Sequence, residues 1–479
     1  MNFASIEKCK VILEQLHSGV SVSGGYRFRL TRRWGEEVEN VQMATIEVLQ
    51  ALQSEVGNRR AGSDGERRAW EWLKARCEAL GLAVELDEFT FVGSERYRPL
   101  LQLITLVWTV VSIGLSFAGQ PLLGAVGFFL LFYYHSVVHK KLDLRLARTR
   151  SQNVIAGLCR PISEYVADRD KGPAFLICAH YDTPRNFPAW YGRVRNLMRF
   201  FGPLALLGIL VYVAYLVLYG LSALIELLGA DGPGVFLARL GPWIGGLTLV
   251  MAAPLLMMML FSSLNALVRT RTDSPGADDN GSGTALVLEM ARRLKERPPA
   301  NVEVFFAWWG AEERGLFGSR QFVRRFHSQL DRDKLYLINA DCVGVGELLT
   351  VYTGQGVIRR QATDPAIIER IERIAARLGV KTIRAWESVI SGGSSDHAGW
   401  VDRGYKHAIS LLCENYRSMS LPARLYAALL RIPDANQLEI NHIHSPADTI
   451  EGIDPQVLEG TTDVAEAYLR EIDGDFSRN

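Results

Sequence analysis

Side chains that can bind metal ions gather in five short segments of this 479-residue chain. The segments read HYDTP (180–184), PGADDNGSG (275–283), GAEERGLFGS (310–319), NADCVG (339–344) and HSPADT (444–449). Their candidate ligands are imidazole and carboxylate groups. Hydrolytic zinc sites use these groups, whereas structural zinc sites favour cysteine. The segments therefore predict a metal site that performs hydrolysis.

Alternating strands and helices must bring the five segments together. We expect strands at 84–91, 153–158, 174–182, 302–310, 335–341 and 406–414, and helices at 62–82, 284–297 and after Asp364 and Asp454. This alternation predicts an α/β fold, a three-layer α/β/α sandwich with a mixed, mostly parallel sheet. Most of the metal-binding segments lie at or just beyond the ends of these strands, where α/β sheets place their ligands.

Four uncharged apolar stretches interrupt this pattern, at 100–117, 121–138, 201–225 and 240–268. Each is near or above the roughly 20 residues that a helix needs to cross a bilayer. We expect them to form two transmembrane helical hairpins, with buried helices of a soluble domain as the alternative. A hairpin returns the chain to its starting side, which the second one must do, because His180 and Asp278 lie on either side of it.

The hairpins define the expected domain organisation. The α/β part is divided into 1–98, 140–199 and 269–479, with transmembrane hairpins at 99–139 and 200–268. Lys and Arg crowd the span ends on the side of this divided part, and the opposite turns offer only Arg239. The bias predicts an integral, multi-pass membrane protein whose larger part is cytoplasmic.

Composition narrows the range of partners. The chain has 53 Lys and Arg against 52 Asp and Glu, a formal net charge of +1, which gives no sign of a nucleic-acid partner. Its six cysteines form no CxxC pair and predict neither a zinc knuckle nor a disulfide framework. Residues 1–20 lack the apolar core of a signal peptide, so we expect no cleaved signal.

The five segments, in this order, resemble the M28 family of zinc peptidases. The resemblance extends from about Asn58 to the end, apart from the hairpins. It implies two Zn2+ ions, or another divalent metal, held by His180, Asp278, Glu313, Asp341 and His444. It also implies that Asp278 bridges the metals, that Glu312 is the general base, and that Asp182 orients the imidazole of His180.

The implied partition places His180, Asp278 and Asp341 on one metal, and Asp278, Glu313 and His444 on the other. Two metals can lower the pKa of a shared water. Glu312 would take the proton of that water and return it to the leaving amine. We therefore expect a membrane-embedded aminopeptidase that acts on peptides, with the lipid bilayer as its second partner.

Other functions compete with this one. Carboxypeptidase or dipeptidase activity would use the same fold. A glutaminyl cyclase would use a single metal, and the presence of both His180 and Asp341 argues against that function. A non-catalytic membrane scaffold would lack ligands that this chain retains. A transporter would usually carry polar or ionisable groups in its spans, whereas these four stretches contain no charged residue.

Some residues near the segments have more than one interpretation. His442 competes with His444 as the last ligand, although the spacing to Ser445, Asp448 and Thr449 favours His444. Asp396 and His397, in GGSSDHAGW (392–400), either line the site or support a loop. Trp308 and Trp309 are expected in the core, with a place in the cleft wall as the alternative.

Overall fold

The computed structural model describes residues 45–92, 97–118, 120, 123, 148–186, 192–230, 232–268, 272–356, 360–388, 394–439 and 442–477. These residues belong to one unit, Gln42–Asn479. Of the expected spans, 121–138 lies almost entirely outside the described residues.

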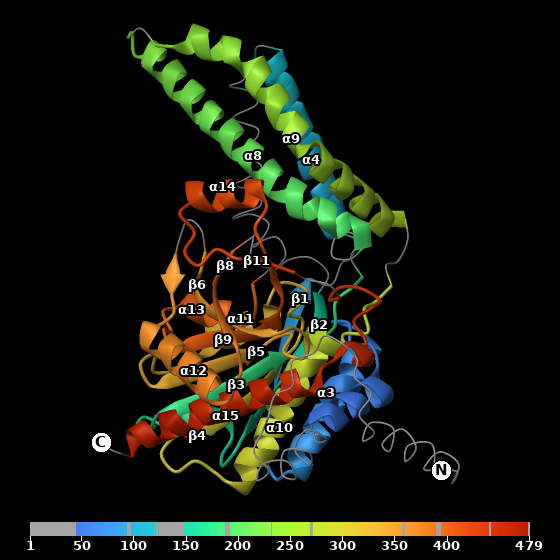
Figure 1. Ribbon diagram of the computed structural model, residues 1–479, viewed down its shortest axis with the longest axis vertical. Coiled ribbons are helices and arrows are strands. Elements are labelled where there is room, and N and C mark those ends of the chain that lie inside the picture. The colour runs from blue at the N-terminus through green and yellow to red at the C-terminus, as the bar shows by residue number, and fades with distance from the viewer. Residues whose placement is uncertain are drawn as a thin grey trace, which may run out of the picture. The chain divides into compact units, whose positions relative to one another are not determined.

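A mixed sheet forms the centre of this unit (Figure 1). Its strands run in the order β1-β2-β4-β3-β5-β9-β6-β7, with β8 paired to β6. They are β1 (Ala83–Val92), β2 (Arg148–Gly157), β3 (Ala174–His180), β4 (Glu303–Trp309), β5 (Leu335–Ala340), β6 (Leu348–Gln355), β7 (Gln361–Ala362), β8 (Thr382–Glu387) and β9 (Ala408–Glu414). The predicted strands are confirmed, whereas β6, β7 and β8 were not predicted.

Parallel pairing is concentrated at the centre of the sheet. β4, β3, β5 and β9 are parallel neighbours, and β8 is parallel to β6. The pairs β1–β2, β2–β4, β6–β9 and β6–β7 are antiparallel. The sheet is therefore mixed, as predicted, but it is mostly parallel only at its centre.

Helices cover both faces of the sheet, because the buried strands carry apolar side chains on both sides. In β3, Phe175 and Ile177 belong to one core, and Leu176 and Cys178 belong to the other. The first core includes residues of α3 (Asp64–Ala79), α10 (Gly283–Glu296), α12 (Pro365–Arg377) and α15 (Pro455–Phe476). The second includes residues of α7 (Ile162–Ala167), α11 (Phe317–Phe326) and α13 (Ala398–Val401). The three-layer arrangement is confirmed.

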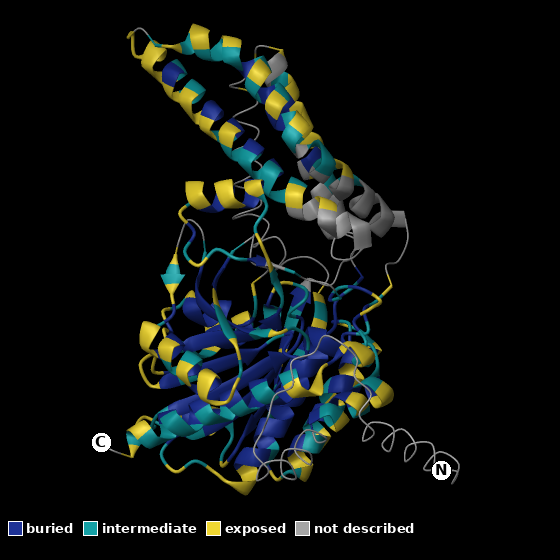
Figure 2. Cartoon of the chain, in the orientation of Figure 1, coloured by how far each residue is buried: buried dark blue, intermediate teal, exposed yellow. Residues whose placement is uncertain are grey.

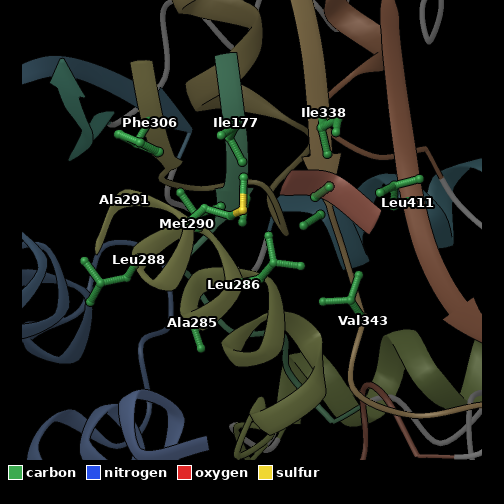
Figure 3. Close-up of a cluster of buried hydrophobic side chains, with 14 of the residues drawn as sticks. Ile177, Ala285, Leu286, Leu288, Met290, Ala291, Phe306, Ile338, Val343 and Leu411 are labelled. Atoms are coloured by element: carbon green, nitrogen blue, oxygen red, sulfur yellow. The ribbon is translucent and has the colours of Figure 1, made fainter. Parts of the chain in front are cut away.

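Helix α10 illustrates the packing of the first core. Its Leu286 and Met290 are fully buried and lie against strand residues Ile177 and Ile338 (Figure 3). The helix follows η4 (Ala277–Ser282), a turn rich in acidic residues, so the packing of α10 also fixes the position of that turn.

Helix starts follow the expected capping chemistry. The side chain of Asp364 accepts a hydrogen bond from the amide of Ala366, and Asp454 does the same for Gln456. Proline occupies the first turn of α12 and of α15, where its missing N–H leaves no intrahelical bond unmade. These two predicted helix starts are confirmed.

Two long apolar helices interrupt the α/β unit between β3 and η4. They are α8 (Gly192–Leu227) and α9 (Gly234–Val268), which pack against each other, and α4 (Tyr97–Phe117) packs against α9. The backbone amide of Gly234 donates to Glu226 Oε1 at 2.9 Å and helps to close the turn between α8 and α9.

Two segments of these helices are long and apolar enough to cross a bilayer, Phe200–Leu227 and Gly234–Met251. In α4 the qualifying apolar stretch, Leu106–Leu115, is shorter. Among the described residues, therefore, only two of the four predicted spans meet the criteria for a membrane helix. The expectation of four spans is not supported.

A buried charge cluster ties α10 to α15. Arg293 is 7% exposed and binds Glu289 at 2.8 Å, Asp463 at 2.7 Å, and Glu459. Glu459 is itself 4% exposed and receives a further hydrogen bond from Thr45. Removing the cation would leave Glu459 buried without its counter-charge, which is strongly unfavourable.

We predict that Arg293→Met lowers the free energy of unfolding by about 3 to 5 kcal/mol. Arg297→Met is the matched control, because the Arg297 side chain is 76% exposed, and it should change stability by less than about 0.5 kcal/mol. Urea unfolding of the detergent-solubilised chain measures both. Equal midpoints for the two variants would contradict the role of Arg293.

Candidate metal centre

Neighbouring strands deliver the candidate ligands to one edge of the sheet. β3 ends at His180, Asp341 follows the last residue of β5, and Glu312 and Glu313 follow β4 after a two-residue turn. Because these strands are parallel neighbours, their carboxyl ends lie together. Asp279 reaches the same edge from η4.

Asp279 lies between two imidazoles. His180 Nε2 lies 3.4 Å from Asp279 Oδ1 and 3.4 Å from Asp341 Oδ1. His444 Nε2 lies 3.1 Å from Asp279 Oδ2 and 3.6 Å from Glu313 Oε1. Each imidazole therefore has a carboxylate of its own, and the two imidazoles share Asp279.

Glu312 and Glu313 belong to the same cluster of candidate metal ligands. Ligand atoms of His180, Asp279 and Glu313 lie within 4.8 Å of one another, and so do those of His180, Glu312 and Asp341. Glu312 Oε2 is 3.9 Å from His180 Nε2. The structure therefore brings together His180, Glu312, Glu313, Asp341 and His444, all of which were predicted as site residues.

Asp278, which was predicted as the bridging ligand, pairs with His442 in the structure. Its Oδ2 lies 2.8 Å from His442 Nε2, and its Oδ1 accepts a 2.8 Å hydrogen bond from the amide of Gly344. Asp279 has non-helical backbone angles, φ −107° and ψ 93°, so the two neighbouring side chains do not share one direction. Asp279 replaces Asp278 as the shared carboxylate, and His442 becomes the partner of Asp278.

Asp182 positions the turn that carries Glu312 and Glu313. Its Oδ1 accepts from the amide of Glu312 at 2.9 Å, and its Oδ2 accepts from the amide of Glu313 at 3.3 Å. The carboxylate also lies 3.6 Å from His180 Nδ1, whereas the Asp182 carbonyl oxygen is closer, at 3.1 Å. The Asp182 carboxylate therefore mainly fixes the glutamate turn, and its predicted role in orienting the His180 imidazole stays a prediction.

Asp448 holds the aspartate turn in the same way. Its two carboxylate oxygens accept from the amides of Asp278 at 2.6 Å and of Asp279 at 3.2 Å. This role was not predicted, although Asp448 belongs to the HSPADT segment. Two buried aspartates thus fix the backbones of the two acidic pairs.

Left-handed backbone conformations occur beside several ligands. Ala311, which precedes Glu312, has φ 53°, Cys342, which follows Asp341, has φ 52°, and His444 itself has φ 54°. Residues other than glycine rarely adopt such angles, and they concentrate at functional sites. The surrounding structure therefore holds the backbone beside these ligands in a strained conformation that sets the direction of their side chains.

Burial and mutual repulsion shift the acidity of the cluster. Burial raises the pKa of Glu312 and of Glu313 well above the ordinary value for glutamate, and neighbouring carboxylates raise the pKa of each further. Burial would lower the pKa of His180, but Glu312 and Asp341 outweigh it and raise that pKa. Burial would raise the pKa of Asp279, but the two histidines outweigh it and lower that pKa.

This arrangement fits divalent cations. Glu313 Oε1 is buried and has no hydrogen-bond partner, although it points toward His444 Nε2. The donors are nitrogen and oxygen, which hydrolytic zinc sites use. Burial raises the pKa of the Cys342 thiol well above its ordinary value, which disfavours a thiolate ligand.

The GGSSDHAGW segment supports the site chiefly through its serine. Ser395 Oγ donates to Asp341 Oδ2 at 2.6 Å. Asp396 is fully buried and accepts a hydrogen bond from Ser319, and burial raises its pKa to about 7. His397 Nε2 lies 3.0 Å from Glu387 Oε2. The two alternatives for Asp396 and His397 therefore resolve toward support of a loop.

The two tryptophans at the end of β4 belong to the core, as expected. Trp308 and Trp309 are fully buried, and they lie in the cores on opposite faces of the sheet. Neither forms a wall of the cleft.

Sequence comparisons point to one family of peptidases. Residues 263–469 match Peptidase family M28. "Aminopeptidase YwaD" of Bacillus subtilis is 30% identical over 199 residues, which cover 41% of this chain and 38% of that protein. A "Probable leucine aminopeptidase" of Arthroderma benhamiae is 30% identical over 189 residues, which cover 38% of this chain and 44% of that protein.

These matches span less than half of the curated relatives. Within that region the chain is similar to the M28 metallo-aminopeptidases, the family that its motifs resemble. Among solved structures, BSAP, a zinc aminopeptidase from Bacillus subtilis, aligns at 16% identity with a TM-score of 0.48, covering 90% of this chain and 94% of that one.

We predict that Asp279→Asn strongly reduces zinc binding, whereas Asp278→Asn retains it. Asp279 is the carboxylate that lies near both imidazoles, and the Asp278 carboxylate is directed to His442 instead. Atomic emission on zinc-loaded, desalted protein counts the bound metal. Loss of zinc from the Asp278→Asn variant alone would restore Asp278 as the shared ligand.

Proposed function

We propose that the chain is a membrane-embedded, two-metal aminopeptidase. The sharing of Asp279 by His180 and His444 carries this proposal, because it creates two adjacent sites of similar donor type. His180 and Asp341 would hold one Zn2+ ion, His444 and Glu313 would hold the other, and Asp279 would bind both. Two such ions act as Lewis acids and lower the pKa of a water between them.

Glu312 is the general base in this proposal. Its side chain is 11% exposed and lies 3.9 Å from His180 Nε2, so it borders the cluster without displacing a ligand. Asp182 fixes the Glu312 backbone. The Glu312 carboxylate would accept a proton from the attacking water and donate it to the leaving amine.

Peptides with a free amino terminus are the proposed substrates. The matched relatives carry the name aminopeptidase, which favours amino-terminal over carboxy-terminal attack. The described part of the chain retains both imidazoles and the acidic residues around them, which disfavours a non-catalytic scaffold.

The α8–α9 hairpin is the proposed membrane anchor. The segment Phe200–Leu227 is strongly apolar, with a mean hydropathy of 2.4, yet only 28% of its most apolar 18 residues are buried within the protein. Leu218 and Leu221 on α8 are 56% and 52% exposed, and Trp243 and Val250 on α9 are 79% and 73% exposed. Core helices of a soluble domain bury such residues, so a bilayer best accounts for them.

The orientation follows from the charges at the span ends. Lys and Arg lie mainly at the span ends on the side of the α/β unit, whereas the other end of the hairpin offers only Arg239, near the start of α9. We therefore place the α/β unit on the cytoplasmic face. α4 packs against α9 and would enter the same membrane region.

We predict that Glu312→Gln slows hydrolysis of an amino-acyl anilide by about 100- to 10,000-fold while zinc content is unchanged, because the variant loses a proton acceptor but no ligand. Glu71→Gln, on the exposed face of α3, is the control and should keep full activity. Chelation of the metal should abolish hydrolysis by the wild type. A substrate whose amino terminus is acetylated should not be hydrolysed.

Two results would overturn the peptidase proposal. One is turnover that persists after the metal has been removed completely. The other is an unchanged rate for Glu312→Gln beside an active wild type.

A further inference from the structure

Helix α14 (Leu421–Leu429) presents apolar side chains to its surroundings. Leu421, Leu425 and Leu429 are 60%, 52% and 62% exposed. Residues four apart lie on one face of a helix, so the three leucines form a single outward stripe. Exposed apolar faces of this kind mark interaction surfaces.

The opposite face of α14 is packed inside the protein. Ala423, Tyr426 and Ala427 are buried in a small core with Trp386 and Ile432. The N-cap Ser420 accepts from the amide of Ala423, which fixes the start of the helix. The outward leucines are therefore held in place by a well-packed inner face.

Helix α8 borders the same small core. Its Leu206, Leu207 and Leu210 pack against the core residues of α14, and the two helices lie side by side (Figure 1). Val211, next along α8, is 45% exposed. Exposed positions occur on both helices (Figure 2). The leucine stripe of α14 thus continues the apolar surface of the proposed membrane anchor.

Charge around α14 favours a lipid surface. The stretch from Arg417 to Arg431 contains Arg424 as a third cation and no acidic residue. Arg424 and Arg431 are exposed. Helices that lie flat on membranes combine an inserted apolar face with arginine or lysine near the phosphate groups.

We propose that α14 lies in the interface of an anionic phospholipid bilayer, with Leu421, Leu425 and Leu429 inserted at the top of the acyl chains. Arg424 and Arg431 lie at the level of the phosphate groups. This inference rests on the proposed anchoring of α8 and α9 in the membrane, which places the neighbouring helix α14 at the bilayer surface.

The chain that follows α14 leads toward the candidate metal centre. That chain returns through β11 (Gln437–Leu438), which pairs with β10 (Tyr416–Arg417), and then reaches His442 and His444. His444, one of the two imidazoles that share Asp279, therefore lies on the chain that follows α14.

Fluorescent labelling of single cysteines tests this inference. The full chain carries Cys9→Ser and Cys159→Ser, since Cys159 is exposed, and the other cysteines are buried. An environment-sensitive dye is attached at Leu425→Cys, at Leu218→Cys on α8, or at Leu378→Cys, an exposed leucine just after α12. Each protein is reconstituted into vesicles of phosphatidylcholine and phosphatidylglycerol.

Nitroxide-labelled lipids and aqueous iodide then serve as quenchers. We expect the Leu425 dye to lose most of its fluorescence to lipids labelled near the top of the acyl chain, and little to iodide. The Leu218 dye should be quenched by lipids labelled deeper in the chain, and the Leu378 dye only by iodide.

The outcomes separate this inference from the proposed membrane anchor. Quenching of the Leu425 dye by iodide, with the Leu218 dye still quenched by lipid, overturns the α14 inference alone. Protection of the Leu425 dye from both quenchers also overturns it, because another protein segment or a second copy would then cover the helix. Failure of lipid to quench the Leu218 dye overturns the membrane anchor itself.

Discussion

Crowding of negative charge around two imidazoles is the constraint on which this site depends. Asp279, Glu312, Glu313 and Asp341 lie about His180; His180 and Asp279 are buried, and the other three side chains are largely buried. Burial raises the pKa of Glu312 and of Glu313 well above the ordinary value, and repulsion from the neighbouring carboxylates raises each further. Divalent cations would relieve this repulsion, which explains why so many acidic side chains can be retained in one place.

The rest of the fold keeps these groups from moving apart. Parallel strands fix His180 and the residues after β4 and β5 at one edge of the sheet. Asp182 and Asp448 each hold two consecutive backbone amides, one under the glutamates and one under the aspartates. The packing of α10 behind η4 completes the support. These backbone hydrogen bonds thus hold the acidic side chains close together against their mutual repulsion.

Continuous apolar runs made the central strands predictable, and the Asp-Pro pairs made the starts of α12 and α15 predictable. Strand β6 was missed because polar residues such as Thr350 and Thr353 are buried in it. Helix α11 was missed because it follows Leu316, which adopts a left-handed conformation and provides no side-chain cap. Asp278 was chosen over Asp279 because sequence order cannot tell which of two adjacent side chains faces the imidazoles.

The position of bound metal tests the central claim most directly. Anomalous scattering at the zinc edge, from crystals of the zinc-loaded chain, would locate each ion independently of any activity. We predict one peak beside His180 and Asp341 and a second beside His444 and Glu313, with Asp279 contacting both. A peak between Asp278 and His442, or a single peak that Asp279 does not contact, would contradict it.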